Sequence, residues 1–284
     1  MENKKIAILT DSSSSIYHMK HDYDNIFMID IPCFIGDAIF TNFKENKDDL
    51  FFAALANTSS VAKTSQPSVG ETLEKFEEIK SKGYTDIIYI PISKELSGTF
   101  QNGYLSKEMT EGIRVEIIDT KTTASILSGM ALEAARLAKL GKSVSEIVGT
   151  VLELRNKTGY FVTVNDLTSL VKNGRLSNAK SVVANLLRIK PVIELTAEGK
   201  LVSLENVRTY KNAIKKMVEH VAKRVDPVKG ELHIAHTNIE ETLTFVQDLL
   251  KEKFPNTKIF AYPVPSTIAA HIGLNAIGLG YINY

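Results

Sequence analysis

Short apolar runs alternate with longer amphipathic segments in the first half of the chain. Four consecutive apolar residues occupy positions 6–9, and similar runs occur at 26–29, 87–90 and 115–118. Runs of this length that are apolar at nearly every position are typical of strands buried on both faces of a parallel sheet. The pattern therefore predicts an α/β fold whose first half is a parallel sheet covered by helices.

The segments between these strands have helical signals. Residues 69–80 carry apolar side chains at helical spacing, and Ser68 and Glu71 have the spacing of a capping box at their start. Residues 125–140 are rich in alanine and precede a glycine, which is a common helix stop. A further helix is expected at 144–155. These helices complete the expected parallel-sheet layer.

The second half of the chain has a different pattern of predicted strands and helices. Strands are expected at 189–195 and 201–204, and the glycine-containing turn between them predicts a hairpin. A hairpin among strand–helix units indicates a mixed sheet. Further strands are expected at 160–164, 232–235, 258–262 and 281–284, and helices at 165–172, 212–224 and 239–251. We therefore expect two α/β domains, residues 1–157 and 158–284.

Hydroxyl-rich segments follow the strands of the first half. They occupy residues 10–15, 63–68 and 92–101. Ligands of open α/β sheets collect at the carboxyl ends of strands, near helix N-termini. Each segment alone is also a normal helix cap, because Ser, Thr and Asp are preferred there. Together they predict a polar pocket, although residues 10–15 lack the glycines of a nucleotide-binding loop.

His271 differs from the other histidines, for which solvated or structural roles are expected. Residues 263–273 suggest a turn and a one-turn helix capped by Ser266, with His271 at its exit. We expect residues 274–280 to form an apolar loop. A neutral imidazole in this position can donate one hydrogen bond to a carboxyl oxygen.

Composition excludes several classes of protein. The 34 basic and 33 acidic residues give a net charge of +1, so nucleic acid or an anionic membrane is not expected as the main partner. The single cysteine, Cys33, cannot form an internal disulfide or a cysteine-based zinc site. No metal-binding motif and no apolar stretch long enough to span a bilayer occur. We expect a soluble, cytoplasmic protein without a metal.

Two further functions remain open from the residues alone. Ser97 and His271 are candidates for a lipid hydrolase or transferase, although Leu96 stands where a Gly-x-Ser-x-Gly motif requires glycine. Alternatively, residues 10–15 are a candidate sensor of a small anion.

Several short motifs resemble those of the DegV family, whose bacterial members bind fatty acids. Each motif alone is weak, but they occur in family order over nearly the whole chain. They are residues 7–12, 64–68, 96–101, 118–120, 166–167, 173–177, 189–191, 207–208 and 271–273. Three positions depart from the family pattern, since Asn173 and Asn275 stand where the family usually has glycine and Leu274 where it usually has proline. Asparagine tolerates the left-handed conformation better than most residues.

The resemblance implies a two-lobed DegV-like fold that holds one long-chain fatty acid between a parallel-sheet lobe and a mixed-sheet lobe. It also implies a monomeric carrier without a cofactor or catalysis of its own. Such a carrier presents the acid to a separate fatty-acid kinase, which forms an acyl phosphate for phospholipid synthesis.

The resemblance also implies roles for individual residues. The expected carboxyl-binding residues are Thr64, Ser65, Ser97, Gly98, Thr99 and His271. Asp11 and Ser12 match the first loop, where a structural or phosphate-facing role is expected, and Arg175 and Arg208 match arginines used around the kinase encounter. For the tail cavity, the candidates are Phe34, Ile35, Leu167, Leu170 and Leu176.

Overall fold

The N-terminal part of the molecule is built on a four-stranded parallel sheet. The computed structural model describes residues 5–41, 48–181, 189–237 and 239–284. The strand order in this sheet is β2-β1-β6-β7, and all neighbouring strands are parallel. The strands are β1 (Ile6–Asp11), β2 (Ile26–Ile29), β6 (Asp86–Tyr89) and β7 (Arg114–Ile117). All six residues of β1 are buried, as the apolar run predicts.

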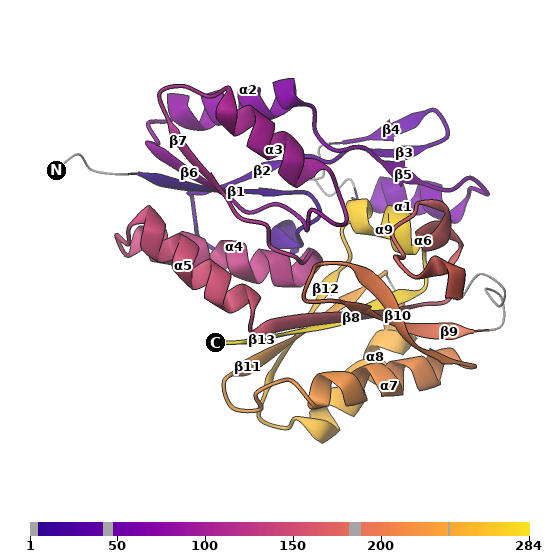
Figure 1. The fold of residues 1–284 in the computed structure, drawn as a ribbon. Helices are drawn as coiled ribbons and strands as arrows, with labels where there is room; N and C mark the ends of the chain where they lie inside the picture. The colour runs from indigo at the N-terminus through magenta and orange to yellow at the C-terminus, as the bar shows by residue number, and fades with distance from the viewer. Residues whose placement is uncertain (1–4, 42–47, 182–188, 238) are drawn as a thin grey trace.

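Helices cover both faces of this sheet (Figure 1). On one face lie α2 (Val69–Ser81) and α3 (Thr99–Glu108), and on the other α4 (Ala124–Lys139) and α5 (Val144–Arg155). The capping box predicted for α2 is present, because Glu71 N donates to Ser68 Oγ at 3.1 Å and Ser68 N donates to Glu71 Oε2 at 2.7 Å.

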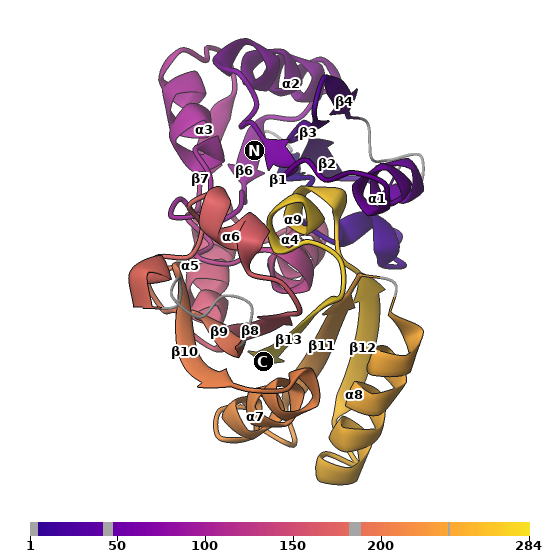
Figure 2. The same ribbon diagram turned by 90° about the vertical axis from the view of Figure 1, so that its right-hand side faces the viewer.

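The C-terminal part contains a six-stranded mixed sheet in the order β10-β9-β8-β13-β11-β12. Only the β11–β12 pair is parallel among the pairs formed by these strands. The strands are β8 (Thr158–Val164), β9 (Lys190–Leu195), β10 (Leu201–Val207), β11 (Gly230–His236), β12 (Lys258–Pro263) and β13 (Ala276–Asn283). Helices α7 (Tyr210–Ala222) and α8 (Glu240–Lys253) cover its outer face (Figures 1 and 2). The predicted combination of a parallel and a mixed sheet is thus confirmed.

Strand β13 corrects one expectation. Residues 274–280 were expected to form a loop, but most of them belong to this strand, which pairs with β8 and β11. Its glycines allow close packing: a Cβ atom at Gly278 would lie 2.3 Å from the hydroxyl of Tyr160, and one at Gly280 would lie 2.6 Å from the same ring. Glycine here makes room for a tyrosine and does not mark a turn.

Helix α4 packs between the two large sheets, where it contacts β1 on one side and β8, β11 and β13 on the other. Its small residues permit this approach, since a Cβ atom at Gly129 would lie 2.4 Å from Ile282 Cδ1. One hydrophobic core contains α4 and side chains from both sheets. The expected domain boundary at residues 157 and 158 falls between α5 and β8, and it stays a prediction.

A group of short elements lies at one side of the junction between the two lobes (Figures 1 and 2). Strands β3 (Cys33–Ile35), β4 (Ala38–Phe40) and β5 (Lys63–Thr64) form a small antiparallel sheet, and α1 (Asp48–Ala56), α6 (Thr168–Lys172) and α9 (Ser266–Ile272) pack beside it. Among the described residues, Ile16–His18 and Ala179–Ser181 form 3₁₀ turns. Within the described ranges, no helix has the length and hydrophobicity needed to cross a membrane.

Candidate functional site

A narrow cavity lies at this junction and receives side chains from both lobes. It has about 460 Å³ of space between atoms, which includes open solvent at its mouth, and the centres of water molecules can occupy about 50 Å³. Its walls come from the ends of β2, β5 and β6 and from α6, α9 and β10. The apolar residues that line it are Ile31, Ile92, Leu96, Leu170, Leu201, Ile268 and Ile272.

Polar groups occur at a few positions in this apolar lining. Thr64 Oγ1 and His271 Nε2 form a hydrogen bond of 2.8 Å, although 207 positions separate them in the chain. The hydroxyl of Ser97 also lines the cavity and bonds to Thr99 Oγ1 at 2.8 Å. Three predicted carboxyl-binding residues, Thr64, Ser97 and His271, therefore line one cavity.

The sequence predicts His271 at the exit of its helix. In the structure His271 lies within the last turn of α9. Ser266 is the first helical residue and does not cap the helix, because Pro265 occupies the cap position. Asp48 of α1 takes the capping role: its Oδ1 accepts the Ser266 N–H at 3.0 Å and also the Ser266 hydroxyl. Because Thr267 and His271 are four residues apart, they share one face of α9.

His271 is held in its neutral form. Burial is the main cause that lowers its pKa to about 4, and the nearby positive charge of Arg175 is the second. Its Nδ1 atom is buried and lacks a hydrogen-bond partner among the described residues. At neutral pH the ring therefore has one N–H to donate and one nitrogen to accept.

Arg175 lines the same cavity and is held by backbone carbonyls. Its Nη1 donates to Asn173 O at 2.6 Å and its Nε to Leu96 O at 3.2 Å. The left-handed residue in this loop is Gly174 (φ 68°), so the asparagine at 173 needs no unusual conformation. The motif that begins at His271 also differs from the family pattern. There Asn275 adopts a left-handed conformation (φ 55°), which asparagine tolerates better than most residues.

The other three predicted carboxyl-binding residues do not line the cavity. Ser65 is exposed, and its hydroxyl donates to Gln66 O at 3.3 Å. Gly98 packs against the side chain of Gln66, where a Cβ atom would lie 2.8 Å from Cδ. Thr99 is buried and contacts Ser97, so its effect on the cavity is indirect.

Asp11 and Ser12 lie behind the cavity walls. Asp11 Oδ2 accepts the Ile92 N–H at 2.7 Å, and burial raises the pKa of this carboxyl group. Ser12 Oγ accepts the Ile31 N–H at 2.8 Å and bonds to Thr267 Oγ1 at 3.1 Å. Ile31, Ile92 and Thr267 all line the cavity. The first loop thus supports the walls from behind.

Of the five tail-cavity candidates, Leu170 lines this cavity. Ile35, Leu167 and Leu176 belong to the large hydrophobic core, and Phe34 is half-buried in β3. Sequence reasoning missed Ile268 and Ile272, whose spacing of four residues beside His271 was the available signal. Arg208 is exposed just after β10.

The structure offers no cluster of metal ligands in the part of the chain that it describes. No group of three or more His, Cys, Asp or Glu side chains gathers there as a metal site. Cys33 is buried, and burial raises the pKa of its thiol, so it is a packing residue.

Sequence comparison identifies the class of this protein. A family profile described as "Uncharacterised protein, DegV family" matches residues 5–284. The chain belongs to the DegV family.

Individual relatives agree with this assignment. The chain is 33% identical to a DegV domain-containing protein of Staphylococcus aureus (strain N315), over 98% of this chain and 97% of that protein. It is similar to the crystal structure of a fatty acid binding DegV family protein from Streptococcus agalactiae, with a TM-score of 0.91, 28% identity and 99% of each chain covered. The Fatty Acid Kinase (Fak) B3 protein of Streptococcus pneumoniae, loaded with linoleic acid, shares the fold at a TM-score of 0.85 and 21% identity, over 99% of this chain and 100% of that one.

Proposed function

We propose that this protein binds one long-chain fatty acid in the cavity and presents its carboxyl group to a separate fatty-acid kinase. The observation that carries the proposal is the pairing of Thr64 with His271 and the nearby Ser97 hydroxyl in an otherwise apolar cavity. The fatty acid binding stated for the Streptococcus agalactiae protein supports it.

The energetics of this site favour an amphiphilic ligand. Burying about fourteen methylenes of a C16 tail removes apolar surface worth roughly 11 kcal/mol before the costs of association. The tail then provides most of the affinity, and the carboxyl group needs only satisfied hydrogen bonds. Thr64, Ser97 and the neutral imidazole of His271 can supply them without leaving an unpaired charge when the acid departs.

The surroundings of Arg175 support a role in phosphoryl transfer. Its guanidinium lines the cavity and has donors beyond the two that bind backbone carbonyls. Positive charge near a carboxyl group that accepts phosphate stabilises the charge that develops during transfer. We assign Arg175 to the phosphoryl-transfer step and exposed Arg208 to the encounter with the kinase. The kinase in the name of the structurally similar Fak B3 protein supports a kinase as partner.

The alternative function, a lipid hydrolase or transferase that uses Ser97 and His271, has less support. The partner of the Ser97 hydroxyl is Thr99, and the partner of His271 Nε2 is Thr64. A nucleophile requires a base within hydrogen-bond reach and a third group that orients the base. The buried Nδ1 of His271 has no such group among the described residues. The anion sensor at residues 10–15 is also disfavoured, because all six residues are buried.

Titration of the delipidated protein with palmitate tests the binding site. Ser97→Ala should lose one hydrogen bond and weaken binding by about 1–2 kcal/mol. Ser65→Ala is the matched control, since Ser65 is an exposed serine outside the cavity, and its affinity should equal that of the wild type. Equal affinities of both variants would refute the assignment of Ser97.

An assay of acyl-phosphate formation with a bacterial fatty-acid kinase tests the presenting role. Arg175→Ala should retain fatty acid affinity within about 1 kcal/mol, because the tail dominates binding. The rate of phosphoryl transfer should fall by at least about tenfold. A normally folded variant that loses fatty acid binding would contradict this division of labour.

A further inference from the structure

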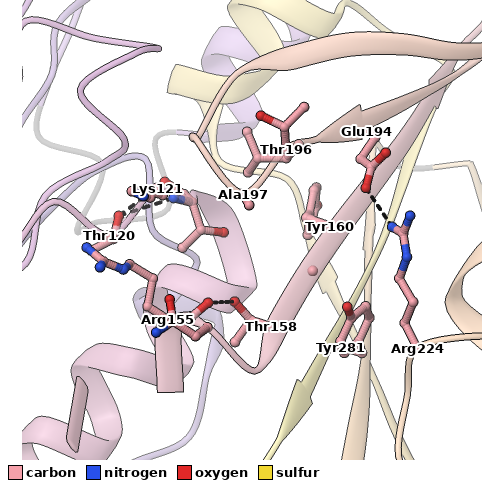
Figure 3. A pocket seen from close by; sticks show the side chains of 14 residues that line it. Thr120, Lys121, Arg155, Thr158, Tyr160, Glu194, Thr196, Ala197, Arg224 and Tyr281 are labelled. Carbon is pink, nitrogen blue, oxygen red and sulfur yellow. Dashed lines mark hydrogen bonds and ion pairs between the residues drawn. The ribbon is translucent and has the colours of Figure 1, made fainter. Parts of the chain in front are cut away.

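A second pocket, which shares no lining residue with the first cavity, lies beside the β9–β10 hairpin (Figure 3). Water centres can occupy about 420 Å³ of it, which suits a small metabolite. Its walls are the loop between β7 and α4, the end of α5, the start of β8, the end of β9 and part of β13. Both lobes therefore contribute to it.

The described lining of this pocket has more basic than acidic side chains. Arg224 Nη1 pairs with Glu194 Oε1 at 2.6 Å, and Glu194 is the single carboxylate in the described lining. Lys121 and Arg155 also line the pocket, and neither is among the ion pairs of the described residues. A hydrogen bond from Thr196 and, more weakly, the charges of Lys121 and Lys200 lower the pKa of the exposed Glu198 carboxyl group beside the pocket. Figure 3 shows Lys121 and Arg155 on the wall facing the Glu194–Arg224 pair. Within the described lining, neither Lys121 nor Arg155 is in ion-pair contact with a carboxylate.

Arg155 is half-buried and only partly satisfied. Its Nη1 donates to Asp119 O at 2.8 Å, whereas its Nε has no partner among the described groups. Arg155 also follows the usual preference for cations at helix C-termini, which is a structural reason for its position. Lys121 lies in the loop between β7 and α4, so this helix preference does not explain its position.

The loop that carries Lys121 is held in an uncommon conformation. Lys121 has a φ of 55°, which is rare for a residue other than glycine. Asp119 Oδ1 accepts the Lys121 N–H at 3.2 Å, and Ser93 Oγ donates to Gly199 O at 2.9 Å. A Cβ atom at Gly199 would lie 3.0 Å from Lys121 Cα. The hairpin therefore packs directly against this loop and fixes it.

Hydroxyls and aromatic rings complete the lining. Thr158 and Thr196 lie on the wall formed by β8 and the hairpin, and Tyr160 and Tyr281 lie between the two charged sides (Figure 3). Thr158 Oγ1 already donates to Arg155 O at 3.0 Å, so the two cations are the main donors that this pocket offers to the oxygens of a phosphate group. We propose that this pocket binds a phosphate-bearing small molecule through Lys121 and Arg155, at a site separate from the fatty-acid cavity.

The test is a titration of ¹⁵N-labelled wild-type protein with inorganic phosphate, and separately with AMP, at constant ionic strength. The proposal expects saturable shifts at amides of residues 120–122 and 194–197, with no shifts at Thr64 and Ser97. Tighter binding of AMP than of phosphate would assign the tyrosines to a ring-bearing ligand, and equal binding would assign the site to phosphate itself. Shifts that do not saturate, or that centre on Thr64 and Ser97, would overturn the proposal.

Charge-removing variants give an independent readout. Lys121→Gln and Arg155→Gln should each weaken phosphate binding about tenfold, as expected for a charge-assisted hydrogen bond. Lys142→Gln is the control, because Lys142 is an exposed lysine paired with Glu146 outside this pocket. Affinities of Lys121→Gln within twofold of the control would contradict the proposal, and the wild-type shifts decide it if Arg155→Gln fails to fold. Both outcomes are independent of fatty acid binding.

Discussion

The three hydroxyl-rich segments of this protein are similar in sequence but differ in where they lie. The loop at residues 10–15 is buried, and its side chains bond to neighbouring protein groups, as Asp11 does to the N–H of Ile92. Thr64 and Ser97 follow similar patterns but line a cavity. Both hydroxyls are also bonded to protein side chains, Thr64 to His271 and Ser97 to Thr99, so what separates them from the buried loop is their position on a cavity wall.

The largest effect that distinguishes these segments is expected from Asp11→Ala. It removes the acceptor of the Ser13 and Ile92 N–H groups inside the protein. Each buried donor left unpaired costs about 1–3 kcal/mol, so the free energy of unfolding should fall by about 3–5 kcal/mol. Urea denaturation measures it, with exposed Asp37→Asn as the control. A loss below 1 kcal/mol would show that the loop is not a structural support.

The next effect concerns the acid sensitivity of the cavity. Because the pKa of His271 is lowered from 6.5 to about 4, the unfolded state binds more protons between these values, and stability falls as the pH decreases from about 6.5 to 4. This histidine contributes up to about 3 kcal/mol to that loss. Denaturation at pH 7 and pH 4 should show a smaller loss for His271→Gln than for the wild type, and equal losses would contradict a buried neutral imidazole.

The smallest effect is expected from Thr64→Val, the counterpart of Asp11→Ala at the cavity. Valine keeps the shape of threonine and removes one hydrogen bond to His271. The free energy of unfolding should change by about 1 kcal/mol or less, and palmitate affinity should fall by about 1–2 kcal/mol. Calorimetry measures both quantities on one preparation. A large loss of stability with unchanged affinity would place Thr64 among the structural supports.

The sequence predicts the fold better than the site. Apolar runs indicated β1 and β6 because strands buried on both faces need apolar residues at nearly every position. The strand predicted at 281–284 is the end of β13, but the first half of β13 was missed because Gly278 and Gly280 resemble loop residues. Glycine is needed there because the ring of Tyr160, distant in the sequence, packs against it. Asp48 was missed for a similar reason, since it caps a helix that is 218 positions away in the chain.

The same distinction holds within the site. Thr64, Ser97 and His271 were predicted from their residue types and the family resemblance, and they line one cavity. The apolar lining was mostly not predicted. Periodicity shows that Leu167 and Leu170 are buried, but which of them faces an empty space depends on how α6 packs against α9.

Native mass spectrometry of the protein purified from a bacterial host tests the central proposal most directly. We predict a mass increment of one fatty acid of about C14–C18, which solvent extraction removes and which added palmitate restores. Protein that carries no acyl chain and fails to take up palmitate after extraction would contradict fatty acid binding at this cavity.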